Sequence, residues 1–172
     1  MKGRILFVLC LLAACKPMEL KQIDLIKNRV LVHVADTTIR AELMDGVVIT
    51  DLRYTYFWFA NGKINSSQGA YSGKLLHGQF NSYHSDTKKL LASGLYDHGL
   101  KKGNWLAWYD SGKLKHSRDY KNGLLDGRAV LYDSAGKPAD TLKYRKGLLK
   151  VKKVDTVGIY HKIRRLLKFR RK

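Results

Sequence analysis

Residues 96–112, with the sequence YDHGLKKGNWLAWYDSG, decide the fold of this chain because the same pattern recurs before and after them. Each copy opens with a tyrosine and a turn, reaches a second glycine, and then places an aromatic residue before a short loop. The copies are spaced by about 24 or 25 residues, which is in the range of repeat architectures. The shared positions are the openings Tyr71-Ser72-Gly73, Tyr96-Asp97-His98-Gly99, Tyr120-Lys121-Asn122-Gly123 and Tyr144-Arg145-Lys146-Gly147, the second glycines Gly78, Gly103 and Gly127, the aromatics Tyr83, Trp108 and Tyr132, and the loops Thr87-Lys88, Gly112-Lys113 and Gly136-Lys137.

One copy is expected to form a β-hairpin. Residues 105–109 are rich in aromatics, as strands are, and a short loop ending in Gly112 leads into a second strand over residues 113–120. Such a loop suits a type I turn whose last residue has a positive φ, so we expect positive φ at Gly112 and at Gly62 and Gly136, which hold the same place. The second glycines are expected to close the turns between hairpins. Stacked hairpins bury a face that one hairpin cannot, so the sequence predicts an all-β, elongated, antiparallel meander.

Two segments of this pattern, residues 120–127 and 103–114, resemble the bacterial variant of the MORN repeat. The resemblance covers Trp58 to about Lys150, somewhat more than half of the chain. The chain departs from the family pattern at Ala129, where an aromatic is usual, and at Thr87, which replaces the turn glycine. The resemblance implies a hairpin array over residues 56–150 that serves as a binding or scaffolding surface. Bacterial members of the family are often labelled antitoxins, which leaves a protein-neutralising module as an alternative.

Residues 29–55 precede the repeats and are expected to cap them. Val30, Val32 and Val34 alternate with other residues, and residues 38–43 alternate again, as strands do. The dipeptide Asp45-Gly46 is a hairpin signal before the apolar residues 47–50. The aromatic run 53–59 is then expected to be the first strand of the array.

The first 14 residues are expected to be a signal peptide. Lys2 and Arg4 precede a short apolar run, and small residues lead to Cys15. The sequence Leu-Ala-Ala-Cys at 12–15 resembles the bacterial lipobox, which implies cleavage before Cys15 and lipid attachment to its sulfur. An ordinary secretory signal is the alternative. Lys16 follows the cysteine, which favours the outer membrane if the host has two, and residues 15–28 are expected to be a tether.

The whole chain of 172 residues carries 33 Lys and Arg against 14 Asp and Glu, a net charge of +19. Much of the excess lies at the C-terminal end, where residues 151–172 form a basic tail. Residues 157–172 have helical spacing, with an apolar stripe through Ile159, Ile163, Leu166 and Leu167. The cations expected on the opposite side, and proposed to bind an anionic surface, are Lys162, Arg164, Arg165, Lys168, Arg171 and Lys172.

The sequence carries no catalytic motif, and we expect neither a catalytic residue, a cofactor nor a metal site. The six histidines lack the close pairing of metal ligands, and His77 and His98 are explained as residues of repeat turns. Nucleic acid is the usual partner of a basic chain, but the lipobox places this one outside the cytoplasm. The expected partners are therefore a membrane, through the N-terminal lipid, and an anionic lipid, glycan or acidic protein, through the basic tail. An envelope enzyme acting on an anionic polymer is a further alternative.

Overall fold

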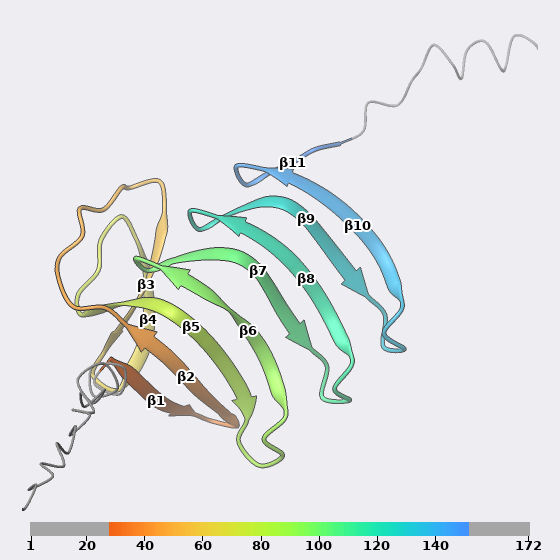
Figure 1. Cartoon of the computed structure of the whole chain (residues 1–172), viewed down its shortest axis with the longest axis horizontal. Coiled ribbons are helices and arrows are strands. Elements are labelled where there is room, and N and C mark those ends of the chain that lie inside the picture. Colours follow the sequence, from red (N-terminus) through yellow and green to blue (C-terminus); the bar gives the residue numbers. More distant parts are fainter. Residues whose placement is uncertain (1–27, 152–172) are drawn as a thin grey trace, which may run out of the picture.

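The structure is a computed structural model and describes residues 28–151. Within that range eleven strands form one open antiparallel sheet, and no helix occurs there (Figure 1). The predicted all-β meander is therefore confirmed. The strands are β1 (Arg29–Val34), β2 (Thr37–Leu43), β3 (Thr55–Ala60), β4 (Lys63–Gln68), β5 (Lys74–His84), β6 (Leu90–Asp97), β7 (Leu100–Trp108), β8 (Leu114–Lys121), β9 (Leu124–Tyr132), β10 (Pro138–Arg145) and β11 (Leu148–Leu149).

The main path of the sheet runs β1-β2-β5-β6-β7-β8-β9-β10-β11. From β5 onward every strand pairs with the next along the chain, so hairpin follows hairpin as the repeats predict. The alternation at residues 29–34 is also confirmed, because β1 pairs with β2 and places Val32 opposite Ile39. Val32 is buried and its neighbour Leu31 is exposed, as expected when successive side chains point to opposite faces.

The hairpin predicted at Asp45-Gly46 is wrong. Residues 44–54 form a loop without a strand, and β2 pairs instead with β5, where Ala41 lies opposite Phe80. The eleven-residue β5 offers β2 a longer ladder than the four residues 47–50 can provide. Side chains bind the loop backbone in place of a strand: the amide of Val48 donates to the Tyr71 hydroxyl at 2.8 Å.

The aromatic strand β3 is not the first strand of the meander, which corrects a second prediction. β3 and β4 form a hairpin that leaves the main path and pairs with it only at the start of β5, through Trp58 opposite Leu75 and Phe59 opposite Lys74. Figure 1 shows this hairpin turned across the end of the sheet that holds β1, β2 and β5. Tyr56 is buried and Phe57 packs against the core, so the aromatic run covers a face instead of extending the sheet.

Two kinds of turn join the strands. Four hairpins use two residues, both with positive φ, as in the type I′ turns that match strand twist: Asn61-Gly62, His98-Gly99, Asn122-Gly123 and Lys146-Gly147. The loops before Lys113 and Lys137 have three residues and end at Gly112 and Gly136, both with φ 81°. Positive φ at Gly62, Gly112 and Gly136 is therefore confirmed. The loop at residues 85–88 is one residue longer, and Lys88, with φ 56°, takes the left-handed position.

The second glycines do not close turns, contrary to prediction. Gly78, Gly103 and Gly127 lie inside β5, β7 and β9, where the register shifts at β-bulges. At Gly127 the φ is 126°, and an added Cβ would lie 2.7 Å from Cβ of Asp119. The Asp119 carboxylate accepts the amide of Arg128 at 3.0 Å, so glycine is required there both for the backbone conformation and for the approach of this side chain. Gly73 lies in the connection from β4 to β5, with φ 152°.

The core is a stack of aromatic rings on one face of the sheet. Trp105 is buried, with ring centroids 4.9 Å from Tyr96, 5.4 Å from Phe80 and 6.3 Å from Tyr120. Its indole Nε1 donates to the carbonyl of Leu95 at 3.1 Å. Burial raises the pKa of Tyr96 well above its usual value. The β3–β4 hairpin covers this part of the sheet, whereas β10 is mostly exposed.

Candidate binding surface

The hairpins place their two kinds of turn at opposite edges of the sheet. The turns at residues 98–99, 122–123 and 146–147 lie along the upper edge in Figure 1, together with the loop 44–54. The loops at residues 85–88, 110–112 and 134–136 lie at the lower edge. We call the first the turn edge and the second the loop edge. Arg53 and Tyr54 help to line a hollow of about 320 Å³ at the turn edge, whose other lining residues are Lys121, Asn122, Leu124, Asp126 and Lys146.

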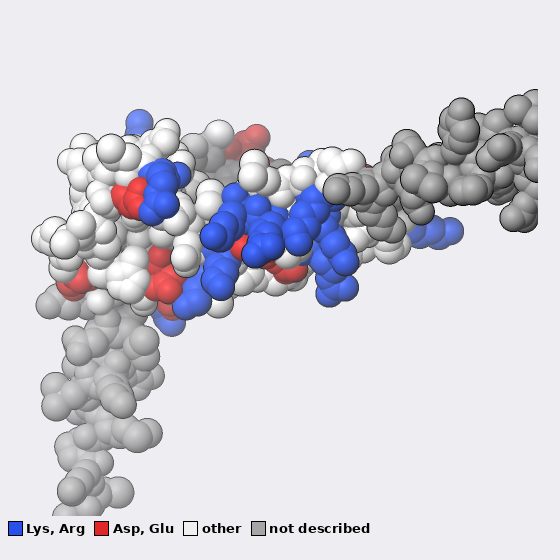
Figure 2. Space-filling model, turned by 90° about the horizontal axis from the view of Figure 1, so that it is seen from above, with Lys and Arg blue, Asp and Glu red and all other residues white. Residues whose placement is uncertain are grey.

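Basic side chains are unevenly distributed along the described chain. Residues 29–99 hold seven Lys or Arg and six Asp or Glu, whereas residues 100–150 hold twelve Lys or Arg and five Asp. The second half of the array therefore carries a net charge of +7, against +1 for the first half. Figure 2 views the molecule from above, toward the turn edge, and shows Lys and Arg gathered in a band over its middle. This band is predicted to attract anions.

Several cations of the turn edge are not neutralised by neighbours. Among the described residues, no carboxylate lies within ion-pair distance of Lys121, Arg145 or Lys146. In contrast, Arg53 bonds Asp51 through three contacts and is the main reason why the pKa of Asp51 falls to about 2. The end of β8, the end of β10 and the turn after β10 therefore provide unpaired positive charge at this edge.

Lys101 lies on the aromatic stack. Its Nζ is 4.5 Å from the ring centroid of Trp105, 5.3 Å from that of Tyr120 and 5.4 Å from that of Phe57. Burial, and next the charge of Arg118, lowers the pKa of Lys101. The ammonium group is stabilised by the faces of three rings instead of by a carboxylate. This lysine thus packs against the aromatic core.

Exposed apolar side chains occur at both ends of the turn edge. In the loop 44–54, Val47 is 95% exposed and Ile49 is 98% exposed, and Leu52 is also exposed. At the other end, Leu148 and Val151 are exposed. Exposed apolar groups on both sides of a basic band are typical of a surface that contacts lipid headgroups and the upper acyl chains. No helix among the described residues is long and apolar enough to cross a membrane.

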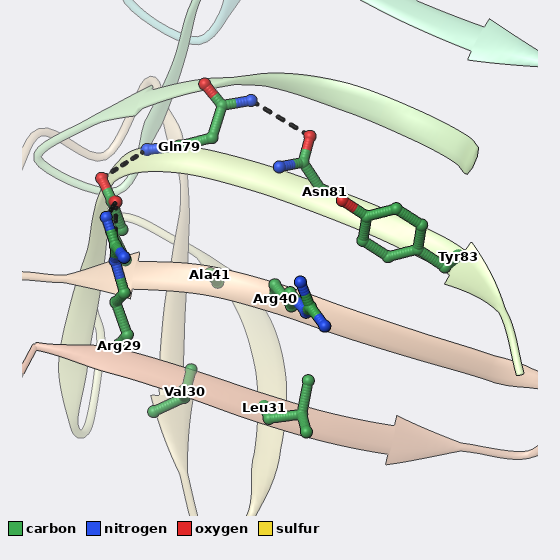
Figure 3. A pocket seen from close by; sticks show the side chains of 9 residues that line it. Arg29, Val30, Leu31, Arg40, Ala41, Gln79, Asn81 and Tyr83 are labelled. Atoms are coloured by element: carbon green, nitrogen blue, oxygen red, sulfur yellow. Dashed lines mark hydrogen bonds and ion pairs between the residues drawn. The ribbon is translucent and has the colours of Figure 1, made fainter. Parts of the chain in front are cut away.

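The face opposite the aromatic core is polar and holds a shallow hollow of about 500 Å³ over β1, β2 and β5 (Figure 3). Its polar groups already bind one another. The Glu42 carboxylate accepts the amide of Gln79 at 2.9 Å and pairs with Arg29 at 2.9 Å. The side-chain amide of Gln79 donates through Nε2 to Oδ1 of Asn81 at 3.1 Å. The Arg40 guanidinium lies 5.6 Å from the ring centroid of Tyr83. The carboxylate of this hollow is therefore committed to structural hydrogen bonds.

The repeat aromatics belong to the core only in part. The repeat position shared by Tyr83, Trp108 and Tyr132 is only half-buried, and the buried aromatics are Tyr56, Tyr96 and Trp105. The predicted lipid-attachment residue Cys15 and the predicted binding residues Lys162, Arg164, Arg165, Lys168, Arg171 and Lys172 lie outside the described residues. They remain predictions.

Sequence reasoning missed one group that the fold brings together. Side-chain donor atoms of His77, Asp97 and His98 all lie within 4.8 Å of one another, at the turn that joins β6 to β7. The pairing of Gly78 with Tyr96 brings His77 opposite Asp97 in the next step of the ladder. The three residues could have been grouped only from the register between β5 and β6, and the spacing of residues along the chain does not give that register.

Comparison of the chain with family models, with curated proteins and with solved structures finds no match.

Proposed function

We propose that this protein is a lipid-anchored binding module of the bacterial cell envelope, which acts by binding an anionic membrane surface along its turn edge. The observation that carries the proposal is the coincidence, at one edge, of unpaired cations and exposed apolar side chains. Lys121, Arg145 and Lys146 supply charge, and Val47 and Ile49 supply apolar surface. The loop edge carries lysines too, but Asp86, Asp110 and Asp133 lie in or beside the same loops and lower its net charge.

The expected strength follows from the number of groups that reach the membrane. Each Lys or Arg near an anionic surface contributes about 1 kcal/mol, so three of them contribute about 3 kcal/mol at low salt. Screening limits this attraction to within about 8 Å at physiological ionic strength, so the edge must lie close to the headgroups. Insertion of Ile49 would add burial of an apolar side chain that solvent now surrounds.

In this proposal the N-terminal lipid on Cys15 supplies attachment, and the basic surfaces supply orientation. A single acyl chain holds a protein only marginally, whereas the several chains of a lipoprotein hold it firmly. The cations of residues 152–172 follow directly after the turn edge in sequence and extend its charge. The anchor and the turn edge would together hold the sheet in one orientation at the envelope, with the outer membrane favoured where there are two.

Binding, as opposed to catalysis, is supported by the state of the half-buried carboxylates on the polar face. Glu42 forms an ion pair with Arg29 and accepts a hydrogen bond from the backbone amide of Gln79. Asp119 accepts hydrogen bonds from the side chain of Asn104 and from the backbone amide of Arg128. Carboxylates held as acceptors at bulges stabilise the sheet, and the remaining exposed surface offers charge and apolar contact.

The test uses the chain from Lys16 to Lys172, which lacks the lipidation site, mixed with neutral or anionic vesicles and sedimented. One variant carries Lys121→Gln, Arg145→Gln and Lys146→Gln at the turn edge. The matched control carries Lys88→Gln, Lys113→Gln and Lys137→Gln at the loop edge and loses the same charge. A third variant ends at Val151.

The wild-type chain is expected to bind anionic vesicles only and to be released by high salt. The turn-edge variant should bind on the order of 100-fold more weakly at low salt, from about 3 kcal/mol of lost attraction, while the loop-edge variant changes little. Equal weakening by both variants would mean that net charge alone causes binding. Binding that is lost in the chain ending at Val151 and unchanged in the turn-edge variant would move the site to the tail.

A further inference from the structure

Three potential metal ligands meet at the turn between β6 and β7. His98 Nδ1 lies 2.6 Å from Oδ1 of Asp97, and His77 Nδ1 lies 3.5 Å from the same oxygen. The two imidazole rings are 4.9 Å apart at their centroids and meet edge to face. All three side chains are partly open to solvent, at 36% to 51% of their full exposure, so an ion can enter from outside.

The fold does not require these three residues at this place. The cross-strand pair His77 and Asp97 corresponds to Lys102 and Lys121 in the next unit, and to Asp126 and Arg145 in the one after. His98 corresponds to Asn122 and Lys146 in the equivalent turns, which have the same left-handed φ of about 50°. The repeat tolerates a pair of lysines or an acid and a base at the same positions, so turn formation does not explain why two histidines and a carboxylate coincide.

The local role of His77 is weak. His77 Nδ1 accepts the amide of His98 at 3.2 Å, and Asp126 does the same for the amide of Lys146 at 3.4 Å. The accepting nitrogen of His77 carries a lone pair, which is the form of imidazole that binds a metal. This hydrogen bond is long, and a metal ion that took its place would replace it with a stronger interaction.

One of the ligand spacings already fits a zinc site, and the others need a small adjustment. Ligands at about 2.0–2.2 Å from a tetrahedral ion lie about 3.3 Å from one another. The 3.5 Å between His77 Nδ1 and Asp97 Oδ1 already matches this spacing. The 2.6 Å between His98 Nδ1 and the same oxygen is a hydrogen bond that must open by about 0.7 Å, which a rotation of the exposed His98 ring can provide.

Lys102 orients the carboxylate of Asp97. Its Nζ donates to Oδ2 of Asp97 at 2.8 Å and leaves Oδ1 directed to the histidines. A group bound to the outer oxygen orients a ligating carboxylate, but a cation at that place also opposes a second cation nearby. Removal of the Lys102 charge is therefore expected to strengthen metal binding. A cluster with a structural role alone would bind no metal and would show no such increase in affinity.

We propose that His77, Asp97 and His98 bind a divalent transition-metal ion, with zinc as the probe, through two imidazole nitrogens and one carboxylate oxygen, with the fourth position open to water. Two imidazoles and a carboxylate suit zinc, nickel and copper better than magnesium or calcium, which prefer oxygen ligands. The ion would join β5 to the β6–β7 turn. This site is independent of the membrane proposal, since none of its three ligands is among the unpaired cations of the turn edge.

The experiment is a calorimetric titration of the full chain in detergent with zinc chloride, in a background with Cys10→Ser and Cys15→Ser to remove thiol ligands. His77→Gln keeps an acceptor for the turn amide, and His98→Asn restores the residue of the equivalent turn at Asn122, so both variants should fold. The matched control is His84→Gln, because His84 also accepts a backbone amide through Nδ1, at 3.3 Å, but lies at the loop edge. Thermal unfolding without zinc checks that each variant is folded.

One zinc ion per chain is expected at this site. His77→Gln and His98→Asn should each weaken binding at least 10- to 100-fold, as much as loss of an outer partner costs in known sites. His84→Gln should leave the affinity unchanged, and Lys102→Gln should raise it. Zinc should raise the melting temperature of the wild type and of His84→Gln, and not that of His98→Asn. Binding that survives both ligand substitutions, or the absence of binding by a folded wild type, would overturn the proposal.

Discussion

Gly94 in β6 is the most informative single position for the packing of the repeat array. It is the one glycine among the described residues whose φ lies outside the left-handed range, so the backbone does not require glycine there. An added Cβ would lie 2.7 Å from Cγ of Trp105 and closer still to two other ring carbons. We therefore expect that Gly94→Ala destabilises the protein by displacing the indole ring.

The expected loss of stability follows from the interactions that the Trp105 ring would lose. Forcing an extra carbon into a packed core costs about 1–3 kcal/mol. A displaced Trp105 also weakens its hydrogen bond to the carbonyl of Leu95, worth about 1 kcal/mol. Contacts with Tyr96 and Phe80 would change as well. Alanine favours strands slightly more than glycine does, which offsets a small part, so the expected net loss is about 3 kcal/mol.

The assay is urea unfolding followed by tryptophan fluorescence, in a double-mutant cycle with Trp105→Ala. In the Trp105→Ala background the ring atoms that clash are absent, so Gly94→Ala should cost less than about 0.5 kcal/mol or become stabilising. A cost of under 1 kcal/mol in the wild-type background would refute the packing described here. So would an equal cost in both backgrounds, because the loss would then come from the backbone of β6.

Further predictions concern loops, titration and processing. Gly112→Ala, at φ 81° with open space around it, should lower stability by about 1 kcal/mol, measured by the same urea unfolding; a neutral result would contradict the left-handed backbone. Burial, followed by the charges of Arg118, Lys115 and Lys101, holds the pKa of His116 below its usual 6.5, so the unfolded chain binds a proton at this residue more readily than the folded chain. The stability of the wild type should therefore fall as the pH drops through 6.5, and that of His116→Gln should fall less. Parallel pH profiles of the two proteins would refute this. Labelled palmitate fed to cells should enter the wild type and not Cys15→Ser, and equal labelling of both would exclude the lipoprotein.

Local rules predicted the hairpins well because each turn is determined by its own residues. Glycine at 62, 112 and 136 takes a conformation that other residues rarely adopt, and the aromatic run around Trp105 forms a strand as its composition indicates. The exception at residues 85–88 shows the limit of this rule, because Lys88 occupies the left-handed position without glycine. Backbone hydrogen bonds close this loop, from the amide of Lys88 to the carbonyl of His84 and from the amide of His84 to the carbonyl of Lys89, both at 2.9 Å.

Pairing between distant segments could not be predicted from local signals. Asp45-Gly46 is a good turn sequence, but β5 competes for β2 and offers a longer ladder. The second glycines occur close to turns in sequence, and only the register across the sheet shows that they lie at bulges. Two of them, Gly78 and Gly127, lie under the acidic side chains of Glu42 and Asp119. The joining of His77 to Asp97 is likewise a consequence of register, and so is the alignment of the loop 44–54 with the turn edge.

The most direct test of the membrane proposal is the environment of Ile49 when the protein is bound to vesicles. An environment-sensitive dye is attached to Ile49→Cys and, as the control, to Ser111→Cys at the loop edge, in chains in which Cys10 and Cys15 are serine. On anionic vesicles the emission of the dye at position 49 should shift to the blue and be quenched by spin-labelled lipid, while the dye at position 111 should show the spectrum of the free protein. Bound protein with an unshifted dye at position 49, or with equal shifts at both positions, would contradict the assignment of the turn edge as the membrane-binding surface.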